Sequence, residues 1–318
     1  MDQDFPEQER LLALGIDAGG TETRWALASP SGEIVAEGHV EGFSATELND
    51  SGRAHVAGIL EDLARAVLAA GRPARVHAGL TGFGDASADL TQLIAGPLGL
   101  PIQAISMGSD IETAYLDLLA PGQGYMVYAG TGSVAAFIDE NGALHRAGGR
   151  GGLIDDGGGG YWIAREALRQ VWRAEDERPG CWRDSPMAQE LFALVGGTDW
   201  AHTRQHVYTG NRGDIGRLAL AVARAADRDP AASGILRAAG TELARLARAM
   251  LGRYGQRPIV LSGRAATLHP LIPESMREAL PDRTPFTLLP CRGHHAAARL
   301  ALRAAGGAPH HPAHDGEP

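Results

Sequence analysis

A carboxylate, two glycines and two threonines gather near the start of the sequence, within the stretch LLALGIDAGGTETRWALA at residues 11–28. Glycines let bare backbone amides approach a ligand, and the hydroxyl and carboxylate oxygens around them can hold a phosphate and its metal ion. The alternative is a plain hairpin turn, for which the same residue types are typical. The residues concerned are Asp17, Gly19, Gly20, Thr21 and Thr23.

A second turn of the same kind has the sequence GTGS at residues 130–133, between apolar runs at 125–129 and 134–138. The polar turn at 139–142 and the strand pattern at 143–147 then repeat what residues 29–40 show after the first turn, which indicates an internal duplication. Two such hairpins facing each other across a cleft could clamp one polyphosphate from both sides. The second set of candidate phosphate ligands is Gly130, Thr131, Gly132 and Ser133.

The first turn must connect two strands, because apolar runs at Leu11–Ile16 and Trp25–Ala28 flank it and no helix pattern follows. A Rossmann turn or a P-loop leads from a strand into a helix, and a P-loop also ends in Gly-Lys-Ser/Thr, which is absent here. Both of these nucleotide motifs are therefore excluded for this stretch.

Strands alternate with helices after the first hairpin, which predicts an α/β fold. We expect strands at 33–40, 75–80 and 102–105, a helix at 56–67 ended by Gly71, and a helix from Asp110 to about Leu119. Pro121-Gly122 marks a boundary, so we expect one domain at 1–120 and a second, mostly helical one at 121–305. Its expected helices are 161–172, 188–195, 215–226, 231–254 and 292–303, with a strand at 258–261. The Gly- and Pro-rich tail at 306–318 is expected to be disordered.

The composition of the chain argues against two classes of binding partner, nucleic acids and membranes. The chain has 318 residues and a formal net charge of -9, which argues against a dedicated nucleic-acid binder. No apolar run is long enough for a membrane span and the acidic leader lacks the features of a secretory signal, so we expect a cytoplasmic protein without membrane contact. Its two cysteines, Cys181 and Cys291, lie far apart and have no metal-ligand spacing.

The two glycine turns together resemble the phosphate motifs of the sugar kinase, heat-shock chaperone and actin superfamily. The Gly-rich run at 148–160 followed by YWIAREAL resembles the N-acetylglucosamine kinase branch, grouped with the BadF/BadG/BcrA/BcrD-type ATPases. The resemblance covers about residues 11–302. It implies two duplicated ribonuclease H-like (actin-like ATPase) domains with a cleft between them, and it is compatible with a homodimer.

The resemblance implies transfer of the γ-phosphoryl group of ATP to a sugar hydroxyl, most simply the 6-hydroxyl of an amino sugar. Asp110 matches the catalytic aspartate, with a helix N-cap as the alternative role, and Asp17 would orient Mg²⁺ through water, with a turn-stabilising role as the alternative. Both glycine turns would hold the phosphates. Gly263 and Arg264 match the adenosine motif, where Arg264 could stack on adenine or be solvated.

The resemblance also implies a set of sugar ligands. N-acetylglucosamine is the first expectation, with glucosamine or another hexose as alternatives, because Thr46 stands where relatives carry Asn and Gly157 where they carry an acidic residue. Without the resemblance, the Gly-rich run could be a flexible linker. The implied sugar ligands are Thr46, Thr81, Gly82, Asp110, Gly149 and Asp156.

Three other functions share this fold. An ATPase activator of a 2-hydroxyacyl-CoA dehydratase would need cysteines near the phosphate motifs, which neither Cys181 nor Cys291 provides. A sugar sensor would carry a basic DNA-binding domain, and a chaperone-like ATPase a substrate-binding domain. Finally, His294 and His295, with tail histidines at 310, 311 and 314, raise the question of a metal site, against which stands the expected disorder of the tail.

Overall fold

The computed structural model describes residues 12–20, 22–43, 52–83 and 87–306. The chain divides into two compact units, residues 1–117 with 292–318 (unit 1) and residues 118–291 (unit 2). The boundary thus lies close to the expected one after residue 120. The second unit does not extend to residue 305, however, because the chain returns to unit 1 from Arg292 onward.

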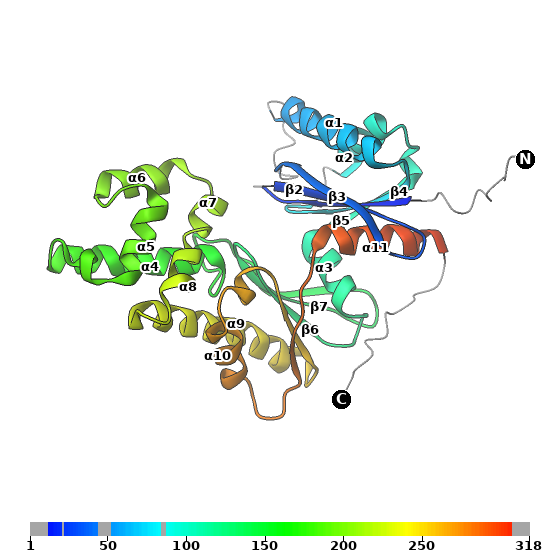
Figure 1. Ribbon diagram of the computed structural model, residues 1–318. Helices are drawn as coiled ribbons and strands as arrows, with labels where there is room; N and C mark the ends of the chain where they lie inside the picture. The colour runs from blue at the N-terminus through cyan, green and yellow to red at the C-terminus, as the bar shows by residue number, and fades with distance from the viewer. Residues whose placement is uncertain (1–11, 21, 44–51, 84–86, 307–318) are drawn as a thin grey trace, which may run out of the picture. The chain divides into compact units, whose positions relative to one another are not determined.

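Unit 1 contains a five-stranded sheet with the strand order β3-β2-β1-β4-β5 (Figure 1). The first three strands are antiparallel neighbours, and β4 and β5 run parallel to β1. The strands are β1 (Leu12–Ala18), β2 (Glu22–Ala28), β3 (Ile34–Glu41), β4 (Pro73–Leu80) and β5 (Ile105–Ser109). The strand expected at 102–105 was placed too early, since a 3-10 turn occupies Ile102–Ala104 and β5 follows it.

Helices cover both faces of this sheet, with α1 and α2 on one side and α3 and α11 on the other (Figure 1). Side-chain size on β1 and β2 explains which helices cover which face of the sheet. Large residues such as Leu14 and Leu27 pack with α1 and α2, whereas Ala26 and Ala28 pack with Ala298 of α11. A Cβ at Gly15 would overlap the backbone of α11, so only glycine permits this close approach. The helices are α1 (Arg53–Ala70), α2 (Ser87–Leu98), α3 (Asp110–Leu118) and α11 (Gly293–Gly306).

Unit 2 contains a second five-stranded sheet, with the order β10-β9-β6-β7-β8. Its antiparallel β6-β7-β8 meander and the parallel neighbours β9 and β10 repeat the pattern of unit 1, as the expected duplication requires. The strands are β6 (Tyr125–Ala129), β7 (Ser133–Ile138), β8 (Leu144–Gly148), β9 (Ile259–Ser262) and β10 (Phe286–Leu288).

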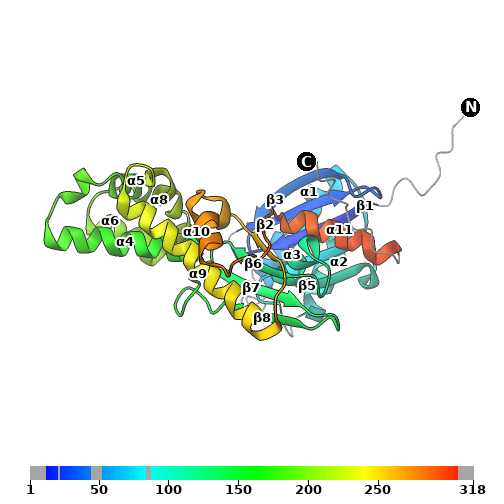
Figure 2. The ribbon, with the colours of Figure 1, turned by 90° about the horizontal axis from the view of Figure 1, so that it is seen from below.

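The remaining helices form the larger hydrophobic core of the protein, in which α9 packs along β6, β7 and β8 (Figure 2). The helix expected at 215–226 is two helices, α7 and α8, and neither α6, α10 nor β10 was expected. The helices are α4 (Gly160–Glu177), α5 (Pro186–Val195), α6 (Trp200–Thr209), α7 (Arg212–Gly216), α8 (Ala219–Ala225), α9 (Pro230–Tyr254) and α10 (Leu271–Ala279). Within the described residues, no helix combines the length and the apolar character needed to cross a membrane.

Candidate functional site

The first group of candidate residues lies at the carboxyl ends of β1, β4 and β5 in unit 1. Because these three strands are parallel, the residues that follow them meet at one edge of the sheet. The backbone N–H of Thr81 donates to the carbonyl of Ala18 at 3.0 Å. The Thr81 hydroxyl donates to Oδ2 of Asp110 at 2.8 Å. Thr81 therefore links the end of β1 to the carboxylate at the start of α3.

Asp110 is the first residue of α3, and the helix N-cap is its neighbour Ser109. The Ser109 hydroxyl accepts a hydrogen bond from the N–H of Glu112 at 3.1 Å, which is the bond that an N-cap side chain makes. Asp110 instead accepts from the N–H of Ile111 through Oδ1, at 2.8 Å. The N-cap alternative for Asp110 is therefore wrong, and its carboxylate is held at the sheet edge by a hydroxyl and the first turn of a helix.

His77 on β4 lies behind this edge and joins β5 to α3. Its Nδ1 lies 2.9 Å from the Ser106 hydroxyl and its Nε2 lies 3.2 Å from the Thr113 hydroxyl. Burial lowers the pKa of His77 to about 4, because the interior disfavours the charged imidazolium. The ring is therefore neutral near pH 7 and serves as a fixed bridge to the helix that carries Asp110.

Asp17 lies on the face of β1 that α11 covers. A Cβ at Gly293 would overlap the Asp17 carboxylate, so the first residue of α11 lies directly against that side chain. The N-terminal end of a helix carries partial positive charge and stabilises a nearby carboxylate. Sequence reasoning missed Gly293, whose partner is distant in the chain.

Within the first glycine turn, the N–H of Gly19 donates to the carbonyl of Glu22 at 3.2 Å. Strand alternation places Thr23 on the face opposite to Asp17, together with Trp25. Thr23 is buried, and its hydroxyl has no hydrogen-bond partner among the described residues. Its expected phosphate contact stays a prediction. Thr21 and Thr46 lie outside the described residues.

The second glycine turn, Gly130–Ser133, is held by the start of α4 in unit 2. The N–H groups of Gly160 and Tyr161 donate to the carbonyls of Gly130 and Thr131, both at 2.9 Å. The N–H of Gly130 in turn donates to the carbonyl of Gly132 at 2.9 Å. This network uses the carbonyl oxygens of the turn, and the N–H groups of Thr131 and Gly132 take no part in it.

The Gly-rich run at 148–160 is tied to the same turn. The N–H of Gly149 donates to the carbonyl of Ser133 at 2.9 Å, and the Ser133 hydroxyl donates to the carbonyl of Gly157 at 2.7 Å. The segment is therefore an ordered loop, and the linker alternative does not hold for it.

The buried side chain of Asp156 holds this loop in place through hydrogen bonds. Its side chain is only 4% exposed, and its backbone has the left-handed φ of +61°. Oδ1 accepts from the N–H of Gly151 at 3.1 Å, and Oδ2 accepts from the Arg212 guanidinium at 2.6 Å. The carboxylate also lies against Gly132. The neighbouring Asp155 pairs instead with Arg245 at 2.8 Å. A sugar contact by Asp156 stays a prediction, and sequence reasoning gave no sign of Arg212.

Gly263 brings the segment after β9 onto the end of β6. Its φ is +101°, and a Cβ there would overlap the backbone of Ala129, the residue before the second glycine turn. Arg264 is exposed next to it. Unit 2 thus brings together its two candidate phosphate segments and the Gly-rich loop. Unit 1 brings together Asp17, Thr81 and Asp110.

Solved structures share this fold over nearly their whole length. One from Chromobacterium violaceum, described as a candidate N-acetylglucosamine kinase, is 25% identical with a TM-score of 0.69, covering 92% of this chain and 99% of that one. A ROK family glucokinase from Streptomyces griseus, in complex with glucose and AMPPNP, is 18% identical with a TM-score of 0.61, covering 92% and 99%. The two mixed sheets are those of the actin-like ATPase fold, as expected.

Residues 14–281 match the model of the BadF/BadG/BcrA/BcrD ATPase family. The match spans most of the chain, and the protein belongs to this family. A curated relative, the N-acetylmuramic acid/N-acetylglucosamine kinase of Clostridium acetobutylicum, is 26% identical over 172 residues, or 52% of this chain and 55% of the relative. The alignment therefore spans little more than half the length of that relative.

Proposed function

We propose that this protein is an ATP-dependent sugar kinase that phosphorylates an amino sugar, with the 6-hydroxyl of N-acetylglucosamine as the preferred acceptor. The observation that carries the proposal is the Asp110 carboxylate at the sheet edge. Ser109 performs the capping, while Thr81 fixes Oδ2 of Asp110 at 2.8 Å. A carboxylate positioned in this way is suited to accept a proton from an attacking hydroxyl.

Other residues of unit 1 are assigned to metal binding and to the orientation of Asp110. Asp17 offers carboxylate oxygens for a magnesium ion, which prefers carboxylate, water and phosphate ligands. The start of α11 beside it keeps that carboxylate in place. Thr81 orients Asp110, and Gly82 follows it at φ +74°. These roles require neither a covalent intermediate nor a further base.

In unit 2, Thr131 and Gly132 offer N–H groups for phosphate oxygens, and Gly263 and Arg264 flank the same turn. ATP, when bound, supplies the phosphoryl group, and in such reactions the protein contributes mainly positioning and charge neutralisation. The donor set suits this group, because backbone N–H groups bind phosphate oxygens, and glycine at 263 lets the segment after β9 lie directly against the end of β6, next to that turn.

The choice of an amino sugar depends on the relatives and on the Gly-rich loop. The curated relative is named for N-acetylmuramic acid and N-acetylglucosamine, and the Chromobacterium structure for the latter. Gly149 and Asp156 belong to the loop that the resemblance assigns to the sugar. Gly157, where the resemblance places an acidic residue in relatives, packs against the side chain of Glu242 on α9, whose carboxylate pairs with Arg245 at 2.8 Å.

The test is a phosphorylation assay with ATP across N-acetylglucosamine, N-acetylmuramic acid, glucosamine and glucose, using wild type, Asp110→Asn and Ser109→Ala. We expect turnover with N-acetylglucosamine and a loss of roughly 10²- to 10⁴-fold in kcat for Asp110→Asn, the range for removing a general base. Ser109→Ala should chiefly lower stability, by about 1 kcal/mol, because it removes a cap.

Two outcomes would contradict the proposal. Turnover of Asp110→Asn within a few-fold of wild type would remove Asp110 from the chemistry. ATP hydrolysis that no sugar in the panel accelerates would favour an ATPase of the activator type over a kinase.

A further inference from the structure

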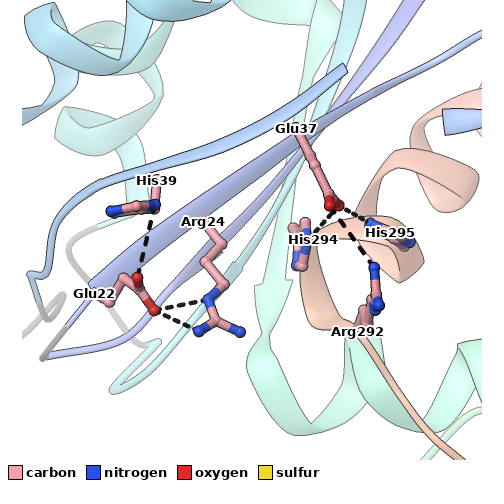
Figure 3. Close-up of polar contacts among 7 residues, drawn as sticks. All are labelled: Glu22, Arg24, Glu37, His39, Arg292, His294 and His295. Carbon is pink, nitrogen blue, oxygen red and sulfur yellow. Dashed lines mark hydrogen bonds and ion pairs between the residues drawn. The ribbon is translucent and has the colours of Figure 1, made fainter. Parts of the chain in front are cut away.

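Two histidines and a glutamate converge in unit 1, and none of them is among the residues assigned above to phosphate, magnesium or sugar. Glu37 lies on β3, whereas His294 and His295 lie in the first turn of α11 (Figure 3). The Nε2 atoms of His294 and His295 lie 3.3 Å and 2.5 Å from the same oxygen, Oε2 of Glu37. The three donor atoms all lie within 4.8 Å of one another.

Two of the three separations can be compared directly with those in a metal-ligand set, and the third, between the two imidazole nitrogens, lies within 4.8 Å. A tetrahedral zinc ion with bonds of about 2.0–2.1 Å holds its ligand atoms about 3.4 Å apart. The Glu37–His294 separation of 3.3 Å already meets this value, and the Glu37–His295 separation has to lengthen by less than an ångström. The Glu37 side chain is 47% exposed, so it has room for this adjustment, while His294 and His295 are held at 8% and 14% exposure.

The surrounding charges leave Oε2 available. Arg292 approaches the other carboxylate oxygen, Oε1, at 3.7 Å (Figure 3). Arg24 on β2 pairs with Glu22, with an Nη2–Oε2 separation of 2.6 Å. Among the described residues, the two imidazoles thus share one carboxylate oxygen while Arg292 faces the other, and three protein ligands are the number found in zinc sites whose fourth ligand is water.

We propose that Glu37, His294 and His295 form a binding site for a divalent transition-metal ion, most favourably Zn²⁺. Two imidazoles and one carboxylate form a donor set suited to zinc, whereas magnesium prefers oxygen ligands alone. Bound metal joins β3 to the first turn of α11. That turn begins at Gly293, which lies against Asp17. The site therefore clamps the helix end that supports the Asp17 carboxylate.

The experiment is a Zn²⁺ titration of the full chain by calorimetry, without ATP or sugar, so that its result is independent of the proposed kinase activity. The tail histidines at 310, 311 and 314 are first replaced by alanine, because His-rich tails bind metals on their own. In this background we expect one equivalent of Zn²⁺ to bind and the melting temperature to rise with Zn²⁺ concentration, as ligand binding to the native state requires. X-ray absorption at the zinc edge should report two imidazole ligands.

Three substitutions assign the site. Glu37→Gln and His295→Ala should each weaken zinc binding at least about tenfold, since even residues that only support a metal ligand contribute this much. The matched control is His39→Ala on the same strand, whose side chain is 71% exposed and lies 3.9 Å from Glu22. It should bind zinc as the parent does. Glu37→Gln keeps a hydrogen-bond acceptor between the histidines, so it separates loss of metal from loss of folding.

Two results would overturn the proposal. One is the absence of zinc binding once the tail histidines are removed. The other is binding that Glu37→Gln and His295→Ala leave as strong as in the His39→Ala control.

Discussion

Acidification should destabilise unit 1 through His77. The ring is partly buried between the hydroxyls of Ser106 and Thr113, and its pKa is lowered to about 4 from its ordinary value of 6.5. In the unfolded chain the same ring regains its ordinary pKa and binds a proton between these two pH values. Because the unfolded state then holds the extra proton, stability must fall as the pH drops from about 6.5 to 4.

The size of this effect follows from the shift. One pKa unit corresponds to 1.36 kcal/mol, so a shift of about 2.5 units makes His77 responsible for a loss of about 3 kcal/mol when the change is complete. At pH 5, part-way through the window, the loss should be about 2 kcal/mol. His77→Gln removes the titrating group and keeps a side chain that can hydrogen-bond to the hydroxyls. Unit 1 of the His77→Gln variant should therefore lose less stability than unit 1 of wild type as the pH falls.

Hydrogen exchange followed by mass spectrometry measures this in unit 1 alone, from peptides that cover β1 and β4, after correction for the intrinsic pH dependence of exchange. The quantity compared is the change in opening free energy between pH 7 and pH 5. The control is His55→Gln on α1, where the histidine is 52% exposed. If the opening free energy of wild type, His77→Gln and His55→Gln falls by the same amount between pH 7 and pH 5, the conclusion that His77 is neutral in the folded protein is refuted.

Three further predictions concern packing and buried charge. Gly15→Ala should destabilise unit 1 by at least about 2 kcal/mol in thermal or urea unfolding, because its Cβ overlaps the α11 backbone, whereas Gly58→Ala on an open face of α1 should be neutral or stabilising. Asp229→Ala should lower unit 2 stability by about 2 kcal/mol, since this buried carboxylate accepts from the N–H of Met187 at 3.0 Å and from two further donors. Asp156→Gly keeps the left-handed backbone but removes the anchor, so it should increase proteolysis of the Gly-rich loop, and protection equal to wild type would contradict this.

The two hairpins and the duplication could be predicted because they are local. Each consists of two apolar runs around a glycine turn, and neighbouring antiparallel strands need no information from elsewhere in the chain. The start of α3 shows the limit of such reasoning. Ser109 and Asp110 are both favoured N-cap residues, and only the bond from Glu112 to Ser109 decides between them. A difference of one residue then changes the role available to the carboxylate.

The return of α11 to unit 1 could not be predicted from the helix itself. Its sequence is rich in alanine, which indicates a helix but not the surface on which it packs. The information lies in the partner strands, where Gly15, Ala26 and Ala28 form a face without large side chains. The same docking places His294 and His295 against Glu37, which is distant in sequence, so the metal-ligand grouping also depends on a tertiary contact.

The Gly-rich loop shows why composition alone misleads about order. Glycine lowers the stability of an ordered segment by roughly 0.5–1 kcal/mol relative to alanine, because it loses more conformational freedom on folding. Here that cost is offset by contacts that no other residue permits. A Cβ at Gly159 would lie 2.6 Å from the backbone of Gly132, and one at Gly158, whose φ is +87°, would lie 2.7 Å from the carbonyl oxygen of Ala239. The glycines therefore allow the loop, the second glycine turn and α9 to pack together, and Asp156 is held in the loop by the hydrogen bonds that it accepts from the N–H of Gly151 and from Arg212.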